Sequence, residues 1–85
     1  MEIIFRTKFN KQLVKQPFDI EIKFYERLRL FKENKHHILL KNHKLHGEWL
    51  NHSSINITSD VRAIYTRNEN TITFVAIGTH SDLYQ

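Results

Sequence analysis

Six histidines are the residues of this 85-residue chain that could carry acid–base chemistry near neutral pH. A free imidazole titrates at about pH 6.5, so one histidine can remove a proton while another donates one. The chain has no cysteine and only two glycines, and it contains no nucleophile elbow or Gly-rich phosphate loop. The sequence therefore gives no support for an acyl-transfer enzyme or for a nucleotide-binding fold. Cleavage of an RNA phosphodiester suits histidines and cations, because the substrate supplies its own nucleophile, the 2′-OH.

His43 lies between Lys41 and Lys44, in a segment (35–46) with three lysines and four histidines but no acidic residue. The two lysines could grip a phosphate beside the imidazole. A solvated surface histidine fits the same pattern. The segment also contains a His-x-x-His spacing, but without cysteine and outside a predicted helix this favours adventitious metal affinity over a built site, and we expect no metal or cofactor.

Three further polar residues stand at the ends of predicted strands. His80 follows Gly78 at the exit of the last strand, where side chains are often functional, although a turn histidine bonded to the backbone is the alternative. Asp60 and Arg62 begin an earlier strand two residues apart, so both are expected on one face of it. On the sequence alone, a turn-forming aspartate and a surface ion pair of little energetic value are the better explanation for these two residues.

Composition places these residues on one small domain, spanning 1–85, with 40% apolar residues. Thirteen Lys and Arg against nine Asp and Glu give a net charge of +4, which makes an anionic partner plausible. The absence of cysteine, of a long apolar run and of a signal-peptide pattern predicts a soluble cytoplasmic protein that does not enter a membrane.

The elements that must position the candidate residues follow from the spacing of apolar residues. Strands are expected over 2–6, 53–57, 61–67 and 71–77, and helices over 8–15 and 19–34. The three consecutive apolar residues 3–5 predict a first strand that is central or buried on both faces. The segment 35–46 is expected to be a loop, 67–70 the turn of a hairpin, and 81–84 a turn or single helical turn that brings Tyr84 near His80. The sequence thus predicts an α+β fold of order β-α-α-β-β-β, with an antiparallel sheet joined by the first strand and packed against two N-terminal helices.

Three motifs resemble those of the RelE/ParE superfamily of bacterial toxins, closest to its YafQ-like and RelE/StbE-type branch. They are an H-K-L-x-G element at residues 43–47, an I-T-x-D-x-R-x-I-Y strand at 57–65 and an I-G-T-H-x-x-x-Y ending at 77–84. The first half of the chain, with its strand, short basic helix and longer helix, also fits the family.

This resemblance implies a metal-independent endoribonuclease that cuts mRNA, usually in the ribosomal A site, and that a cognate antitoxin silences. It implies that His43 and His80 are the catalytic histidines, that Asp60 is their acidic partner, that Arg62 faces the scissile phosphate and that Tyr84 closes the site. Lys41, Lys44 and Arg67 are then expected to hold RNA phosphates. The antitoxin is expected to bind through an acidic, partly disordered segment.

One family feature is absent. A histidine that YafQ carries on the strand before Asp60 matches Asn56 here, and His52 is a candidate to replace it. Three other interpretations remain: a ParE-type inhibitor of DNA gyrase, a non-catalytic RNA- or ribosome-binding module, and an inactive variant of the toxin.

Overall fold

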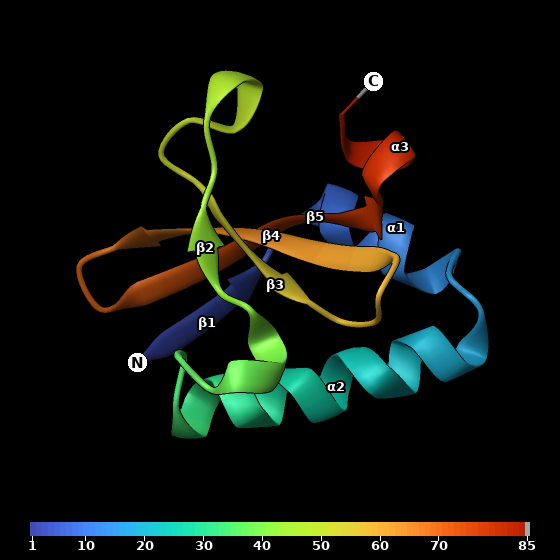
Figure 1. The fold of residues 1–85 in the computed structure, drawn as a ribbon, viewed down its shortest axis with the longest axis horizontal. Helices are drawn as coiled ribbons and strands as arrows, with labels where there is room; N and C mark the ends of the chain where they lie inside the picture. The colour runs from blue at the N-terminus through green and yellow to red at the C-terminus, as the bar shows by residue number, and fades with distance from the viewer. Residues whose placement is uncertain (85) are drawn as a thin grey trace.

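The sheet has five strands in the order β1-β5-β4-β3-β2 (Figure 1). The structure, a computed structural model, describes residues 1–84. Its strands are β1 (Glu2–Phe5), β2 (His43–Lys44), β3 (Ser53–Asn56), β4 (Val61–Asn68) and β5 (Thr71–Thr79), and its helices are α1 (Thr7–Val14), α2 (Phe18–Glu33), α3 (His80–Leu83) and the short 3₁₀ turns η1 (Ile38–Leu40) and η2 (Gly47–Trp49). β1 pairs with β5 in parallel, and every other pair is antiparallel. The predicted α+β class and the joining of the first strand to the late hairpin strands are therefore confirmed.

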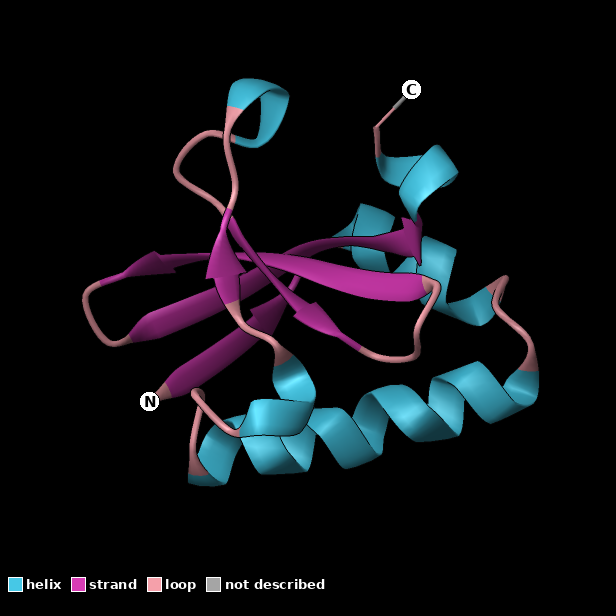
Figure 2. Cartoon of the chain, in the orientation of Figure 1, coloured by secondary structure: helices cyan, strands magenta, loops and turns pink. Residues whose placement is uncertain are grey.

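Helices α1 and α2 cover one face of the sheet, together with η1 (Figure 2). In α2 the apolar residues Ile20, Phe24, Leu28 and Phe31 recur every three or four positions and form one face of the helix, which packs on the main core. Asp19 and Glu21 in the first turn of α2 complement the positive end of the helix dipole. The predicted covering of the sheet by two N-terminal helices is confirmed.

Phe74, on β5, is the centre of this core. Its ring centroid lies 5.6 Å from those of both Phe9 and Phe24 and 5.8 Å from that of Phe5, so it joins α1, α2 and β1. The side chain of Phe74 is completely buried. Aromatic pairs at such separations stabilise a fold beyond the burial of their area.

The opposite face carries a smaller apolar cluster. Leu45, Ile64, Ala76 and Leu83 are buried there, with the segment after β2 and helix α3 lying over that side of the sheet (Figures 1 and 2). A wide part of this face is left without a helix of the length of α1 or α2.

Two expectations about the elements were wrong. β1 is an edge strand and is not buried on both faces: Ile3 and Phe5 pack on the core, whereas Ile4 points outward and is 42% exposed. The segment 35–46 is not a simple loop, since it contains η1 and the two-residue strand β2. Neither was visible in the sequence because β2 is defined only by its pairing with β3, and edge position is a property of the whole sheet.

The remaining boundaries agree closely with the expectations. The β4–β5 hairpin turns through Glu69 and Asn70, and Glu69 adopts the left-handed conformation with φ of 55°. The predicted single helical turn at the C-terminus is α3. No helix within residues 1–84 combines the length and apolar character that crossing a membrane requires.

We expect Phe74→Ala to lower the free energy of unfolding by about 3–5 kcal/mol, because it removes a ring that packs against rings from four other elements, β1, α1, α2 and β4, and leaves a cavity. Urea denaturation followed by circular dichroism measures the change. Phe18→Ala is the matched control: its ring is 76% exposed, so the loss should stay within about 0.5 kcal/mol. Similar losses for both variants would contradict this description of the core.

Candidate nuclease site

Two of the candidate residues, His43 and Arg62, lie on the sheet face that α1 and α2 leave open. His43 pairs with Ser54, whose neighbour on β4 is Ile64 of the smaller cluster. Cross-strand partners point to the same face of a sheet, so His43 lies on this open face. Arg62 lies on it as well, because its partner Asn56 is two residues after Ser54.

The His43 ring is held in one orientation by the backbone. Its Nδ1 lies 2.8 Å from the carbonyl oxygen of Lys41, and since a carbonyl only accepts, Nδ1 carries the hydrogen. In the neutral ring Nε2 is then the basic nitrogen, and its nearest polar contact is the buried Ser54 hydroxyl at 3.5 Å. Lys41, the residue after η1 and two residues before β2, has a left-handed backbone with φ of 45°. His43 therefore presents a proton-accepting nitrogen on the open face.

The rings of His80 and Tyr84 are in contact just after β5, in a tilted arrangement. Their ring centroids are 4.6 Å apart with an angle of 33° between the planes. Both residues belong to the last turn of the chain, where the Tyr84 amide donates to the His80 carbonyl. The expectation that Tyr84 lies near His80 is confirmed.

A capping box fixes the start of α3. The Thr79 hydroxyl accepts from the Asp82 amide at 3.2 Å, and the Thr79 amide donates to the Asp82 carboxylate at 3.0 Å. That amide, followed by the Thr79 hydroxyl, holds the pKa of Asp82 below its ordinary value. A depressed carboxyl pKa means that the cap is intact at neutral pH and is lost only as the pH falls through that lowered value.

Gly78 allows α3 to fold back against β5. A Cβ atom at this position would lie 2.9 Å from the Cβ of Asp82 and 3.0 Å from its carboxylate oxygen Oδ2, closer than unbonded carbon atoms approach. The prediction that a glycine here permits close approach is therefore confirmed, and the approaching group is the capping aspartate.

Trp49 is a positioning residue that sequence reasoning missed. Its indole Nε1–H donates to the carbonyl oxygen of Leu83 at 2.9 Å, which ties η2 to the end of α3 beside Tyr84. A single, half-buried tryptophan needs a partner for its indole N–H, and this is the signal that could have drawn attention to it.

Asp60 is not part of the strand in which the sequence pattern placed it. β4 begins at Val61, so Asp60 belongs to the preceding bend and strand alternation does not set its direction. The Thr58 hydroxyl accepts from the amides of Asp60 and Val61 at 3.2 and 3.1 Å and shapes this bend. The Asp60 side chain is exposed, and among residues 1–84 the one ion pair is Lys23–Glu26, so Asp60 and Arg62 do not form the surface pair considered above.

The structure separates His52 from Asn56. Asn56 is the last residue of β3, whereas His52 precedes the first, so they stand at opposite ends of the strand. The His52 ring donates from Nδ1 to the Leu50 carbonyl at 3.0 Å and packs against Trp49. The side-chain oxygen Oδ1 of Asn56 is buried without a hydrogen-bond partner. His52 thus lies away from the position of the absent histidine.

Of the three cations expected to hold RNA phosphates, two lie on the face of the sheet opposite His43. Lys44 pairs with Ser53 and, across β3, with Tyr65 of the main core, so it points to the face opposite His43. Arg67 is two residues beyond Tyr65 and shares its face, while Lys41 stands before β2. Lys44 and Arg67 therefore do not face the open surface that carries Arg62. Within the described residues no three His, Asp or Glu side chains are placed to hold a metal ion together.

We expect Trp49→Phe to loosen α3 while the core stays intact, because it removes the indole donor and keeps an aromatic ring. Hydrogen exchange of the Tyr84 amide should become faster, with a loss of about 0.5–1.5 kcal/mol in the protection of α3. Tyr25→Phe is the control, since this exposed ring lies on α2. Unchanged exchange at Tyr84 in the Trp49 variant would show that the indole bond does not hold α3.

Comparison with solved structures shows the same fold in bacterial toxins. YafQ from Escherichia coli strain BL21(DE3) superposes with a TM-score of 0.83 at 19% identity, over 99% of this chain and 98% of that one. A YoeB/ParE toxin from Agrobacterium tumefaciens gives a TM-score of 0.76 at 16% identity, over 94% of this chain and 99% of that one. The E. coli DinJ–YafQ complex matches with a TM-score of 0.74 at 19% identity, over 99% of this chain and 98% of that one.

Sequence comparison identifies the family. No curated protein sequence matches the chain. The sequence model of the family described as "Bacterial toxin of type II toxin-antitoxin system, YafQ" matches residues 1–85, the whole chain. The shared fold and the match over every residue agree, and this chain belongs to the YafQ family of bacterial toxins from type II toxin–antitoxin systems.

Proposed function

We propose that this toxin is an endoribonuclease that cleaves mRNA, in association with the ribosome, without a metal ion. The observation that carries the proposal is the fixed His43 ring, whose basic Nε2 lies on the same open face as Arg62. A strand of RNA on that face would meet a proton acceptor and a permanent cation, which are two of the three groups that this cleavage requires.

The third group is a second acid–base residue, and His80 at the end of β5 is our candidate for it. In the proposed reaction one of His43 and His80 removes the proton from the 2′-OH, and the oxygen attacks the adjacent phosphorus. The bond to the leaving 5′-oxygen breaks as the other histidine, or Asp60, donates a proton to it. The products are a 2′,3′-cyclic phosphate and a free 5′-hydroxyl, and Arg62 stabilises the charge that develops on the phosphate.

Tyr84 supplies a base-stacking surface in this site. It is half-buried against the smaller cluster, and its contact with His80 fixes the ring beside a catalytic group. Stacking of one base on an aromatic ring contributes about 1–3 kcal/mol in proteins that bind single strands.

We also propose that an antitoxin inhibits this chain. E. coli YafQ, which has the same fold, is found in the DinJ–YafQ toxin–antitoxin complex. The net charge of +4 suits an acidic segment. β1 is an edge strand with its outer side unpaired among the described residues, so a strand of the antitoxin can extend the sheet there.

The first test is inducible expression in a bacterial host, with primer extension on abundant transcripts. The wild-type chain should arrest growth and produce discrete new 5′ ends, and His80→Ala should do neither. His37→Asn is the matched control: it removes an imidazole but keeps an acceptor for the Leu39 amide, and it should behave as the wild type. Arrest with intact mRNA would refute the nuclease and direct the next assay to DNA gyrase.

A graded effect is expected at Tyr84. Tyr84→Phe keeps the stacking surface and should cleave RNA at close to the parental rate, whereas Tyr84→Ala should lower kcat/KM by about 5- to 150-fold, the equivalent of about 1–3 kcal/mol. Single-turnover cleavage of a labelled RNA separates the binding and chemical steps. Equal rates for the Ala and Phe variants would remove Tyr84 from the site.

A further inference from the structure

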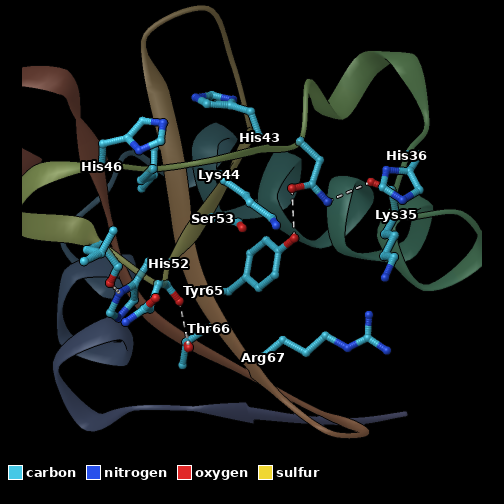
Figure 3. Close-up of a pocket in the computed structure, with 14 residues that line it drawn as sticks. Lys35, His36, His43, Lys44, His46, His52, Ser53, Tyr65, Thr66 and Arg67 are labelled. Atoms are coloured by element: carbon cyan, nitrogen blue, oxygen red, sulfur yellow. Dashed lines mark hydrogen bonds between the residues drawn. The ribbon is translucent and has the colours of Figure 1, made fainter.

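A cavity of about 760 Å³ lies beside β2 at the edge of the sheet (Figure 3). Its walls include Lys35 and Lys44 from the segment before and within β2, and Tyr65 and Arg67 from β4. It reaches around the β2 edge, because Lys44, Tyr65 and Arg67 line it from the helix-covered face of the strands and His43 lines it from the open face. In Figure 3 the His43 ring points away from the side to which the Lys44 chain extends.

The cavity is positively charged. Lys35, Lys44 and Arg67 carry permanent charges, and His36 and His52 add to them when protonated. No aspartate or glutamate lines it, and the one ion pair of residues 1–84 joins Lys23 to Glu26 elsewhere. Cations without carboxylate partners around a hollow attract anions and concentrate them there.

The wall of the cavity is held by a chain of hydrogen bonds. The Tyr65 hydroxyl donates to the side-chain oxygen of Asn42 at 2.8 Å, and the Asn42 amide donates to the Lys35 carbonyl at 3.0 Å. These bonds connect β4 to the segment that carries Lys35 and Lys44 (Figure 3). Arg67 donates from Nε to the Glu69 carbonyl at 3.1 Å, which anchors the base of its guanidinium and leaves the terminal nitrogens free of this bond.

The cavity can bind a ligand through its positive charge but not through base stacking on Tyr65. The Tyr65 ring is only 6% exposed and packs edge-on against Phe31 at 5.1 Å, so it is not available to a base. Ammonium and guanidinium groups recognise phosphate oxygens, and arginine does so with two parallel bonds.

We propose that this cavity binds a backbone phosphate of single-stranded RNA outside the site of cleavage. RNA is favoured over an acidic polypeptide because His43, on β2, lines the cavity and also belongs to the proposed nuclease site. One polymer that crosses the β2 edge therefore reaches both. This proposal rests on the proposed nuclease function, since RNA is the substrate of that reaction. RNA binding at the cavity can nevertheless be measured without cleavage.

The test compares Lys44→Gln/Arg67→Gln with Lys11→Gln/Lys15→Gln, which removes the same charge from exposed positions. Lys11 lies on α1 and Lys15 just after it, and α1 packs on β5, at a distance from β2 in the sheet. The probe is a fully 2′-O-methylated single-stranded RNA, which lacks the attacking hydroxyl, and fluorescence anisotropy follows its binding at several salt concentrations. Equal thermal unfolding of the two variants and the wild type shows that both are folded.

We expect the Lys44/Arg67 variant to bind the RNA more weakly and with a shallower dependence on salt. The slope of log K against log salt concentration should fall by about 0.7 for each phosphate contact that is lost, whereas the Lys11/Lys15 control should keep the wild-type slope. With cleavable RNA, KM should rise while kcat changes little for a long substrate. A dinucleotide, too short to span both sites, should be cleaved equally by the Lys44/Arg67 variant and the wild type.

Unchanged affinity and slope in the Lys44/Arg67 variant would overturn the proposal, even if the wild type cleaves RNA. A poly-glutamate chain that binds the wild type more tightly than RNA of equal charge, and loses that advantage in the variant, would also overturn it in favour of an acidic protein segment. If the wild type does not cleave RNA but the Lys44/Arg67 variant still shows a shallower salt dependence of RNA binding, the phosphate site in the cavity is supported. The proposed nuclease activity is then refuted.

Discussion

The packing of the Phe74 ring on β5 is the contact on which the other elements depend. β5 pairs with β1 on one side and β4 on the other, and Phe74 projects from it into the rings supplied by both main helices. Because both main helices and strands β2 to β4 separate β1 from β5 along the chain, their parallel pairing requires this core to have formed. The same strand then ends at Thr79, so the position of His80 follows from the burial of Phe74.

The alternation of side chains along β2 and β3 gives this small sheet two different surfaces. His43 and Lys44 are neighbours in sequence, yet the register of β2 on β3 points His43 toward the open face and Lys44 toward the helix-covered face. A single sheet edge can thus offer acid–base chemistry on one side and fixed positive charge on the other. In this arrangement separate residues perform the proposed cleavage and the proposed binding of the RNA backbone.

The end of the chain is ordered by a few directional bonds and little apolar area. Helix α3 has four residues, too few to be stable alone, and depends on the Thr79–Asp82 capping box, the Trp49 indole bond and the burial of Leu83. Gly78 makes this possible, since any side chain there would collide with Asp82. His80 and Tyr84 are therefore held by residues to which the proposed reaction assigns no step.

The sequence by itself determined the elements whose evidence is local. Apolar spacing predicted α2, alternation predicted β3 to β5, and Gly78 before His80 predicted a close approach, because each depends on residues near one another in the chain. Only the tertiary structure decided that β1 is an edge strand, that β2 exists, that Trp49 holds α3 and that Lys44 and Arg67 face away from Arg62. These features arise from pairing and register between distant segments, where a shift of one residue turns every side chain to the other face.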